Sequence, residues 1–294
     1  MPFSGLVGDT MKPPPMIIFT DLDGTLLDHH DYSFDAAMPA LQAIRSRDVP
    51  LILATSKTLA EVRQINRALD NPKPAIVENG CALCFPLGQD YPFEISRHEQ
   101  IDDYAVLRYP PSYAQIRQFI EQQRSSHRWR LRGFGDMSAT AVAESTGLGE
   151  HAAEYAKRRL CSEPFLWDDS EENLKKFMAA ADAAGLSVTQ GGRFWHLMGR
   201  SSKAQAIETM RNLYAADNQR SLTVIALGDS ENDRGMLQRA DIAVVIKRHD
   251  GTHLDCHGLK QTLLTQQPGP AGWNAAILEI LTEPGSVNPS IQGD

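Results

Sequence analysis

Two aspartates separated by one residue stand in the segment FTDLDGTLL, directly after the apolar run Met16-Ile17-Ile18. The apolar run is typical of a short buried strand, so Asp21 and Asp23 are expected where that strand ends. In open α/β sheets, ligands bind outside the carboxyl ends of the strands. One carboxylate at that place can attack phosphorus, and a second carboxylate two residues later can move a proton. This chemistry also requires a metal site, a positive charge and a substrate pocket.

A third aspartate follows another apolar run in TVIALGDSEND. Asp229 is placed there to bind a hard cation, with Asn232 or Asp233 in support. Magnesium prefers oxygen ligands, usually one or two carboxylates together with substrate phosphate and water. Asp21, the main-chain carbonyl of Asp23, and Asp229 fit that requirement. Alone, GDSEND is equally compatible with an ordinary turn and a helix N-cap, but its occurrence together with DLDGT favours the metal site.

Two further residues suit the binding of phosphoryl oxygens. Thr55 ends a second apolar run in ATSKT, and its hydroxyl and the nearby backbone N–H groups precede a predicted helix. Lys203, in GRSSKAQA, begins a predicted helix that leads back to the Asp229 strand. A lysine at a helix start is commonly solvated. Its position favours a functional role, because a phosphoryl transition state spreads charge over three oxygens that an ammonium can neutralise.

Strand-like and helical patterns alternate around these residues. The first part of the chain predicts strands at 16–20, 50–55 and 74–77 and helices at 36–47 and 59–69; the last part predicts helices at 202–215, 231–239 and 274–281 and strands at 222–227 and 242–246. This β-α-β order is the signature of a doubly wound, Rossmann-like parallel sheet. The fold class is therefore α/β.

The segment between these two parts has a different pattern. It predicts helices at 113–123, 138–145, 150–160 and 171–184, strands at 129–133 and 165–168, and a hairpin that turns at Gly191-Gly192. We expect an α+β cap at 89–198, inserted into a core formed by 16–88 and 199–282. Flexible tails are expected at 1–15 and 283–294.

Composition narrows the functional class. The 294 residues have a net charge of -8, which argues against a nucleic-acid partner, and no apolar run approaches the length needed to span a bilayer. The N-terminal segment lacks the pattern of a secretory signal, and the four cysteines do not suggest a disulfide scaffold, so we expect a cytoplasmic protein. Cys81 and Cys84 form a lone C-x-x-C that we interpret as small apolar residues beside the core rather than a zinc or redox site.

The segments DLDGT, ATSKT, SSK and GDSEND, in this order, resemble the haloacid dehalogenase superfamily of aspartyl-phosphate enzymes. Within it the chain is similar to the mannosyl-3-phosphoglycerate phosphatase family, through SKTLAE, VENG, RRLCSEPF, GGRFWHL and GPAGW. The resemblance spans about residues 15–281. It implies a magnesium-dependent phosphatase that converts 2-O-mannosyl-3-phosphoglycerate to mannosylglycerate and phosphate.

The resemblance also implies roles for individual residues. Asp21 is the nucleophile, and Asp23 donates a proton to the leaving alcohol and later accepts one from water. Thr55 and Lys203 hold the phosphoryl oxygens, and Asp21, Asp23 and Asp229 hold Mg²⁺. Ser56-Lys57 stands where many relatives have Ser-Gly, so the role of Lys57 stays open; Glu231 and Gly235 stand where prolines are expected.

Substrate-binding residues are expected at Ser56 and Asn79 in the core and at Arg158, Arg159 and Glu163 in the cap. Arg132 and Arg193 are further candidates for binding a substrate carboxylate, and each arginine is alternatively a solvated surface residue. Glu163 accepts sugar hydroxyls or caps a turn. His196, Trp129, Trp167 and Phe134 are better explained as structural residues than as catalytic or sugar-stacking ones.

The partner we expect is a small phosphosugar, and the oligomeric state stays open. Three alternatives remain: a phosphatase for a related substrate such as glucosyl-3-phosphoglycerate or sucrose phosphate, a phosphomutase, and a regulatory module phosphorylated on Asp21. The inserted cap and Asp23 argue against the regulatory module, because such a module needs neither a lid nor a leaving-group acid.

Overall fold

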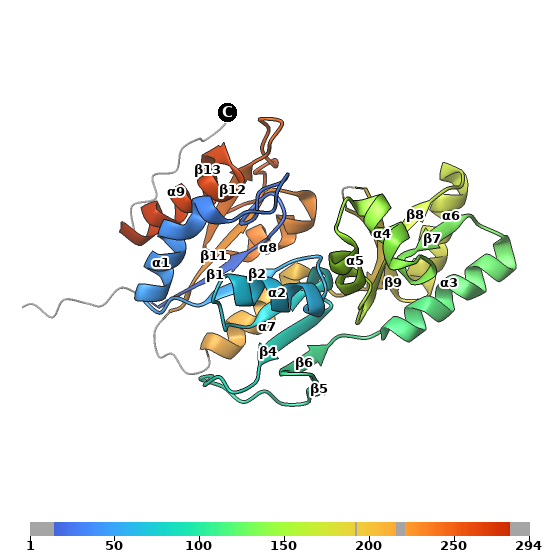
Figure 1. Cartoon of the computed structure of the whole chain (residues 1–294), viewed down its shortest axis with the longest axis horizontal. Helices are drawn as coiled ribbons and strands as arrows, with labels where there is room; N and C mark the ends of the chain where they lie inside the picture. The colour runs from blue at the N-terminus through green and yellow to red at the C-terminus, as the bar shows by residue number, and fades with distance from the viewer. Residues whose placement is uncertain (1–14, 192, 216–220, 283–294) are drawn as a thin grey trace, which may run out of the picture.

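The computed structural model of the protein describes residues 15–191, 193–215 and 221–282. The expected tails therefore lie outside the described residues, apart from Pro15. The described chain forms two lobes, each built on its own β-sheet (Figure 1). The predicted α/β class with a large parallel sheet is confirmed.

The larger sheet has nine strands in the order β13-β12-β11-β1-β2-β3-β4-β6-β5. Their bounds are β1 (Met16–Thr20), β2 (Leu51–Ala54), β3 (Ala75–Val77), β4 (Ala82–Pro86), β5 (Glu99–Ile101), β6 (Tyr104–Arg108), β11 (Thr223–Gly228), β12 (Ile242–Lys247) and β13 (Gln261–Pro268). The pairs from β13 to β3 are parallel, whereas β4, β6 and β5 continue the sheet in antiparallel pairs.

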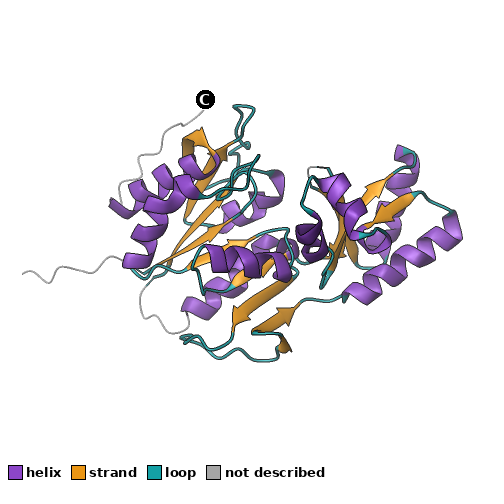
Figure 2. Ribbon diagram, viewed as in Figure 1, coloured by secondary structure: helices purple, strands orange, loops and turns teal. Residues whose placement is uncertain are grey.

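Helices cover both faces of this sheet (Figure 2). They are α1 (Met38–Ser46), α2 (Leu59–Ala68), α7 (Lys203–Ala215), α8 (Arg234–Arg239) and α9 (Gly269–Thr282). Alternate residues of β1 enter different clusters: Ile18 packs with residues of α1, α2 and α9, and Ile17 and Phe19 pack with residues of α7 and α8. Burial on both faces explains why the central strands are continuous apolar runs.

The smaller sheet is antiparallel, in the order β7-β8-β10-β9, with β7 (Leu131–Gly133), β8 (Ser162–Trp167), β9 (Leu186–Gln190) and β10 (Trp195–Gly199). Its helices are α3 (Tyr113–His127), α4 (Ala139–Thr146), α5 (Glu150–Ala156) and α6 (Glu171–Ala183). Ile116 of α3 and Phe177 of α6 share one apolar cluster with this sheet, and Val142 of α4 and Ala153 of α5 lie in another. We call this lobe the cap and the larger lobe the core.

Two chain segments join the lobes and pass close to each other. One runs from β6 to α3 through Pro110-Pro111, and the other runs from β10 to α7. A Cβ on Gly199 would stand 2.4 Å from the carbonyl oxygen of Pro110, so only glycine allows this approach. The close crossing fixes where the cap is attached to the core.

The structure differs from the sequence-based expectation at several boundaries. Strands β5 and β6 belong to the core sheet, although residues 89–108 were assigned to the inserted unit, so the cap sheet and its helices begin only after Pro111. Strand β13 was not predicted, and α9 begins at Gly269 rather than at Asn274. Pro270 is compatible with that start, because the first turn of a helix does not need its N–H.

None of the helices within the described residues combines the length and the apolarity that crossing a bilayer requires. Cys81, Cys84 and Cys161 are buried free thiols, which agrees with the interpretation of Cys81 and Cys84 as small apolar residues.

Candidate active site

The carboxyl ends of β1 and β11 bring two distant parts of the chain together. These strands pair in parallel with Thr20 opposite Leu227, and the backbone N–H of Asp21 donates to the carbonyl of Leu227 at 2.9 Å. Asp21 and Asp229 therefore follow adjacent strands at the same edge of the sheet. The chain folds in this way because both strands are largely apolar and each is followed by polar turn residues.

Lys203 is held at the same place by two carboxylates. It is the first residue of α7, and its side chain is only 1% exposed. Its Nζ lies 2.7 Å from Oδ1 of Asp21 and 2.6 Å from Oδ1 of Asp233. The alternative of a solvated lysine at this position is therefore wrong, since a buried ammonium is retained only with such partners.

Asp233 organises the loop after β11. It is fully buried, and its Oδ2 accepts hydrogen bonds from the N–H of Asp229, the N–H of Ser230 and the hydroxyl of Ser230. The sequence suggested Asn232 or Asp233 as support for Asp229, and the structure gives the close contacts to Asp233. Asn232 instead donates to Oδ1 of Asn79 at 3.4 Å.

Three carboxylates converge at this edge. One oxygen each of Asp21, Asp229 and Asp233 lies within 4.8 Å of the others. Burial raises the pKa of Asp21 well above its ordinary value, and Asp233 raises it further, although Lys203 opposes the shift. Burial, followed by the charge of Asp233, raises the pKa of Asp229 to about 6, against the lowering effect of Arg248. The cluster carries more negative charge than Lys203 balances.

This donor set fits a hard divalent cation. Carboxylate oxygens are the ligands that Mg²⁺ selects, and an added double positive charge would relieve the repulsion within the cluster. Gly24 leaves room beside it: this residue has φ 75°, and a Cβ there would lie 3.1 Å from Oδ2 of Asp229. Asp21 and Asp229 of the predicted metal set meet here, while Asp23 is not part of the carboxylate cluster.

Asp23 lies apart, in an ion pair with Lys57. The Nζ of Lys57 is 2.8 Å from Oδ1 of Asp23, and the side chain of Asp23 is 41% exposed. Burial disfavours the ammonium of Lys57, but the charges of Asp23 and Glu61 outweigh it and raise the pKa of Lys57. Of the two aspartates in DLDGT, Asp23 is therefore the one that remains accessible from solvent.

The loop after β2 carries the predicted phosphate-binding residues. Thr55 is buried, and its hydroxyl accepts from the N–H of Lys57 at 3.2 Å. Thr58 and Glu61 form a capping box that starts α2 three residues later. Because β2 pairs with β1, Thr55 and Asp21 follow neighbouring strands at the same edge of the sheet.

Glu78 ties the cap to the core, a role that the sequence analysis did not detect. It is fully buried after β3, and its carboxylate accepts from the N–H groups of Leu160 and Cys161 and from the hydroxyl of Ser162. Arg159 approaches it at 3.5 Å and also donates to the carbonyl of Ser56 at 3.2 Å. A glutamate between a buried strand and an Asn-Gly pair in VENG was the available signal.

The predicted substrate-binding residues of the cap differ in burial and in their contacts. Glu163 is buried, and its carboxylate accepts from Tyr113, Arg117 and the N–H of Gly135 at 2.7–2.8 Å. These contacts hold α3 and the turn after β7 against β8, so they give Glu163 a structural role. Arg158 is exposed beside the ring of Tyr155.

The remaining cap residues singled out in the sequence are two arginines and three aromatic residues. Arg193 donates to the carbonyl of Ser145, and Arg132 lies exposed on β7. Trp129, Trp167 and Phe134 pack within the apolar clusters of the cap, as predicted.

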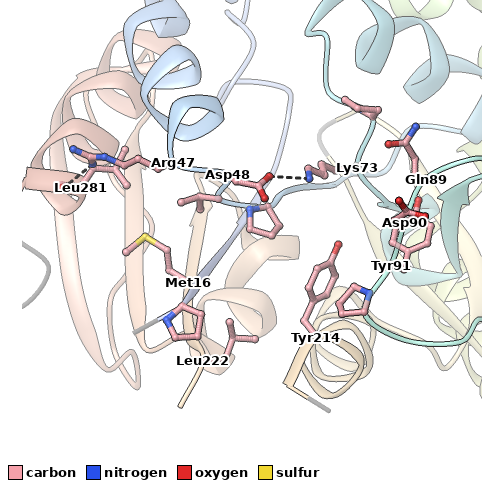
Figure 3. Close-up of a pocket in the computed structure, with 15 residues that line it drawn as sticks. Met16, Arg47, Asp48, Lys73, Gln89, Asp90, Tyr91, Tyr214, Leu222 and Leu281 are labelled. Carbon is pink, nitrogen blue, oxygen red and sulfur yellow. Dashed lines mark hydrogen bonds and ion pairs between the residues drawn. The ribbon is translucent and has the colours of Figure 1, made fainter. Parts of the chain in front are cut away.

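A cavity lies away from the carboxylate cluster. It has a volume of about 780 Å³ and is lined at the opposite end of the core sheet by Met16, Arg47, Lys73, Tyr91 and Tyr214, among others (Figure 3). Met16 begins β1, whereas Asp21 follows its end. This cavity is therefore separate from the carboxylate cluster.

The sequence of this chain is similar to those of known proteins. Residues 18–251 match the family of haloacid dehalogenase-like hydrolases. A glucosyl-3-phosphoglycerate/mannosyl-3-phosphoglycerate phosphatase from Methanococcoides burtonii is 38% identical over 90% of this chain and 97% of its own length. The protein of the same name from Persephonella marina is also 38% identical, over 91% of this chain and 98% of its own length.

Solved structures share the fold at lower identity. A phosphatase of the haloalkanoate superfamily from Bacteroides thetaiotaomicron, BT1666, superposes with a TM-score of 0.62 at 18% identity, covering 95% of this chain and 98% of its own. Protein 0175 of Thermoplasma acidophilum gives a TM-score of 0.61 at 17% identity, covering 90% and 98%. These similarities extend over both lobes.

Proposed function

Because this chain belongs to the haloacid dehalogenase-like hydrolases, within the mannosyl-3-phosphoglycerate phosphatase family, we propose that it is a Mg²⁺-dependent phosphatase. Its proposed substrate is 2-O-mannosyl-3-phosphoglycerate, which it hydrolyses to mannosylglycerate and phosphate through an aspartyl phosphate. The names of the relatives also favour the glucosyl counterpart as a second substrate.

The observation that carries this proposal is the cluster around Asp21. A buried carboxylate bonded to a buried ammonium, beside two further carboxylates, combines a nucleophile, a charge for phosphoryl oxygens and a donor set for a hard cation. A purely structural ion pair does not need the two additional carboxylates, which raise the energy of the folded protein.

The proposed reaction has two displacements at phosphorus. An oxygen of Asp21 forms a bond to phosphorus as the bond to the ester oxygen breaks, and Asp23 gives its proton to the departing alcohol. Asp23 then takes a proton from a water molecule, whose oxygen attacks phosphorus and releases Asp21 and inorganic phosphate. Lys203 and Thr55 balance and orient the phosphoryl oxygens.

Asp21, Asp229 and the main-chain carbonyl of Asp23 would hold Mg²⁺. When bound, the ion supplies positive charge that reduces repulsion between the carboxylates and the phosphate. Asp233 acts on these groups indirectly, since it fixes Lys203 and the N–H groups of Asp229 and Ser230.

The cap is proposed to close the site against water and to select the substrate. Ser56, Asn79 and Arg158 remain candidates for contacting it. Arg159 is proposed to act through the junction instead, because its guanidinium already contacts Glu78 and the carbonyl of Ser56.

A phosphate-release assay with a panel of esters tests the proposal. The panel contains mannosyl- and glucosyl-3-phosphoglycerate, sucrose phosphate and mannose 6-phosphate, each with Mg²⁺ and with EDTA. We expect the highest kcat/KM for a glycosyl-3-phosphoglycerate and loss of turnover in EDTA. No phosphate release from any ester in Mg²⁺ would refute the function, and an isomeric product without free phosphate would identify a mutase.

A further inference from the structure

Lys57, in ATSKT, has no task in the proposed reaction, and its surroundings are those of a binding group. Its side chain is 12% exposed, with Nζ 2.8 Å from Oδ1 of Asp23 and 5.2 Å from the centroid of the Tyr32 ring. Its backbone is fixed at both ends, because its N–H donates to the hydroxyl of Thr55 and its carbonyl accepts from the N–H of Glu78. A solvated surface lysine has none of these constraints.

We propose that Lys57 binds the carboxylate of the substrate and thereby selects phosphate esters that carry a carboxylate two carbons from the phosphorylated carbon. This inference rests on the proposed function and deepens it. It assigns the recognition of the acidic group to the core, at the proton-transfer residue, instead of to an arginine of the cap.

The distances support this assignment. The ester oxygen must come within about 3 Å of the carboxyl of Asp23 to receive its proton. Nζ of Lys57 is 2.8 Å from Oδ1 of Asp23, so it lies within about 6 Å of the ester oxygen when Oδ1 gives the proton and within about 8 Å when Oδ2 gives it. In a 3-phosphoglycerate ester, three bonds of about 1.5 Å join the ester oxygen to the carboxylate carbon, so the carboxylate is within about 5 Å of that oxygen. The ammonium is therefore close enough for the carboxylate to reach it by rotation about the bonds of the glycerate.

The ammonium also has the necessary donors. A lysine ammonium carries three N–H groups, and the ion pair with Asp23 occupies one direction while the face of the Tyr32 ring covers another. A second carboxylate can therefore join the first without displacing it. The substrate carboxylate and Asp23 would then share one cation, which keeps the departing alcohol next to the residue that protonates it.

The other cations near the site have partners that hold them elsewhere. Lys203 binds Asp21 and Asp233, and Arg159 binds Glu78 and the Ser56 carbonyl. Arg248 donates to the carbonyl of Asp229 at 2.8 Å. Among the cations that contact the proposed active-site residues in the described part of the chain, Lys57 is the one paired with the accessible Asp23.

The test compares two substrates that differ only in the acidic group: 2-O-glucosyl-3-phosphoglycerate and 2-O-glucosylglycerol 3-phosphate, in which CH₂OH replaces the carboxylate. For wild-type protein we expect a higher kcat/KM with the carboxylated ester. In Lys57→Met this preference should fall about 10- to 100-fold, mainly through KM, as expected for the loss of one charged hydrogen bond. Lys57→Arg should restore a large part of the preference, since it keeps the positive charge.

Lys73→Met is the matched control, because Lys73 pairs with the exposed Asp48 in the distant cavity, and this variant should keep the wild-type preference. An equal fall of kcat/KM for both esters in Lys57→Met and Lys57→Arg would overturn the inference, since Lys57 would then act only through Asp23. A wild-type protein that cleaves both esters equally would overturn it as well. Failure of the proposed function is distinguishable, because wild-type protein would then release phosphate from neither ester.

Discussion

Two buried carboxylates, one in each lobe, have opposite surroundings. Asp21 in the core is 6% exposed and accepts a hydrogen bond from Lys203; Glu163 in the cap is fully buried and accepts one from Arg117. Burial raises the pKa of both. For Glu163, the N–H of Gly135 and the hydroxyl of Tyr113 oppose this shift, whereas for Asp21 the next contribution is the repulsion of Asp233.

This difference distinguishes a structural ion pair from the proposed catalytic one. Glu163 has enough donors to satisfy its charge, so its network is complete within the folded cap. Asp21 stands among like charges that its lysine only partly balances, so the proposed cation would relieve repulsion in the core. Substitution of Asp21 should therefore affect activity more than stability, and substitution of Glu163 should affect stability.

The largest effect is expected for Asp21→Asn. Phosphate release should fall by about 10⁴-fold or more, because the amide oxygen is a poor nucleophile toward phosphorus. Without divalent cations, the melting temperature at pH 7–8 should stay the same or rise, since a carboxyl whose pKa is raised by folding destabilises the folded state when ionised. Phosphate assays and thermal unfolding in EDTA measure the two effects.

Asp48→Asn is the control for that variant, because the side chain of Asp48 is 91% exposed at the far end of the core. It should retain wild-type turnover and stability. A large loss of stability in Asp21→Asn would show that the two carboxylates are alike and would remove the contrast between the lobes.

The sequence predicts that the charged residues of the core meet, but it does not predict the contacts at the junction between core and cap. Asp21, Asp229 and Lys203 lie next to apolar runs or helix starts, and adjacent parallel strands end at one edge, so their meeting follows from local pattern and topology. The role of Glu78 depends on N–H groups 82 and 83 residues away, whose direction only the folded junction defines. Strand β13 was missed for a different reason: as an edge strand it carries exposed polar residues, so its sequence QTLLTQQP lacks a continuous apolar run.

A smaller effect on stability is expected in the cap. Glu163→Gln should lower the free energy of unfolding by about 2–4 kcal/mol, because an amide NH₂ replaces one of the two oxygens that accept from Tyr113, Arg117 and Gly135, and buried donors then face a donor. Arg117 keeps Asp136, which limits the loss. Glu121→Gln is the matched control: Glu121 also pairs with Arg117 but is 62% exposed, so its loss should cost less than about 1 kcal/mol. Equal losses in urea unfolding of the two variants would contradict the structural role of Glu163.

Binding of Mg²⁺ should stabilise the core, because the ion offsets the excess negative charge of the carboxylate cluster. At a Mg²⁺ concentration of about 100 Kd, the wild-type protein should gain about 2.7 kcal/mol of unfolding free energy relative to EDTA. Asp229→Asn should lose most of this gain, because Asp229 belongs to the carboxylate cluster. Glu163→Gln should keep the gain, because Glu163 lies in the cap and is not part of that cluster. Thermal unfolding across a Mg²⁺ titration measures the shift. A wild-type curve that does not move with Mg²⁺ would mean that the cluster holds no cation.

The smallest effect concerns the pH dependence of the cap. Burial, followed by the charge of Arg159, lowers the pKa of His196 to about 3, and its Nδ1 has neither a hydrogen-bond partner nor solvent contact. The unfolded chain binds a proton at this histidine below about pH 6.5, while the folded chain does not, so stability should fall as the pH decreases from about 6.5 toward 3. Between pH 7 and pH 5 this amounts to about 1–2 kcal/mol.

His196→Asn should lack this part of the loss, and His151→Asn, at a side chain that is 78% exposed, should retain it. The difference between each variant and the wild type, measured by urea unfolding at both pH values, cancels the contributions of the core carboxylates. If His196→Asn follows the wild-type pH dependence, then His196 protonates in the folded cap, and the cap has an unsatisfied charge of its own like that of the core.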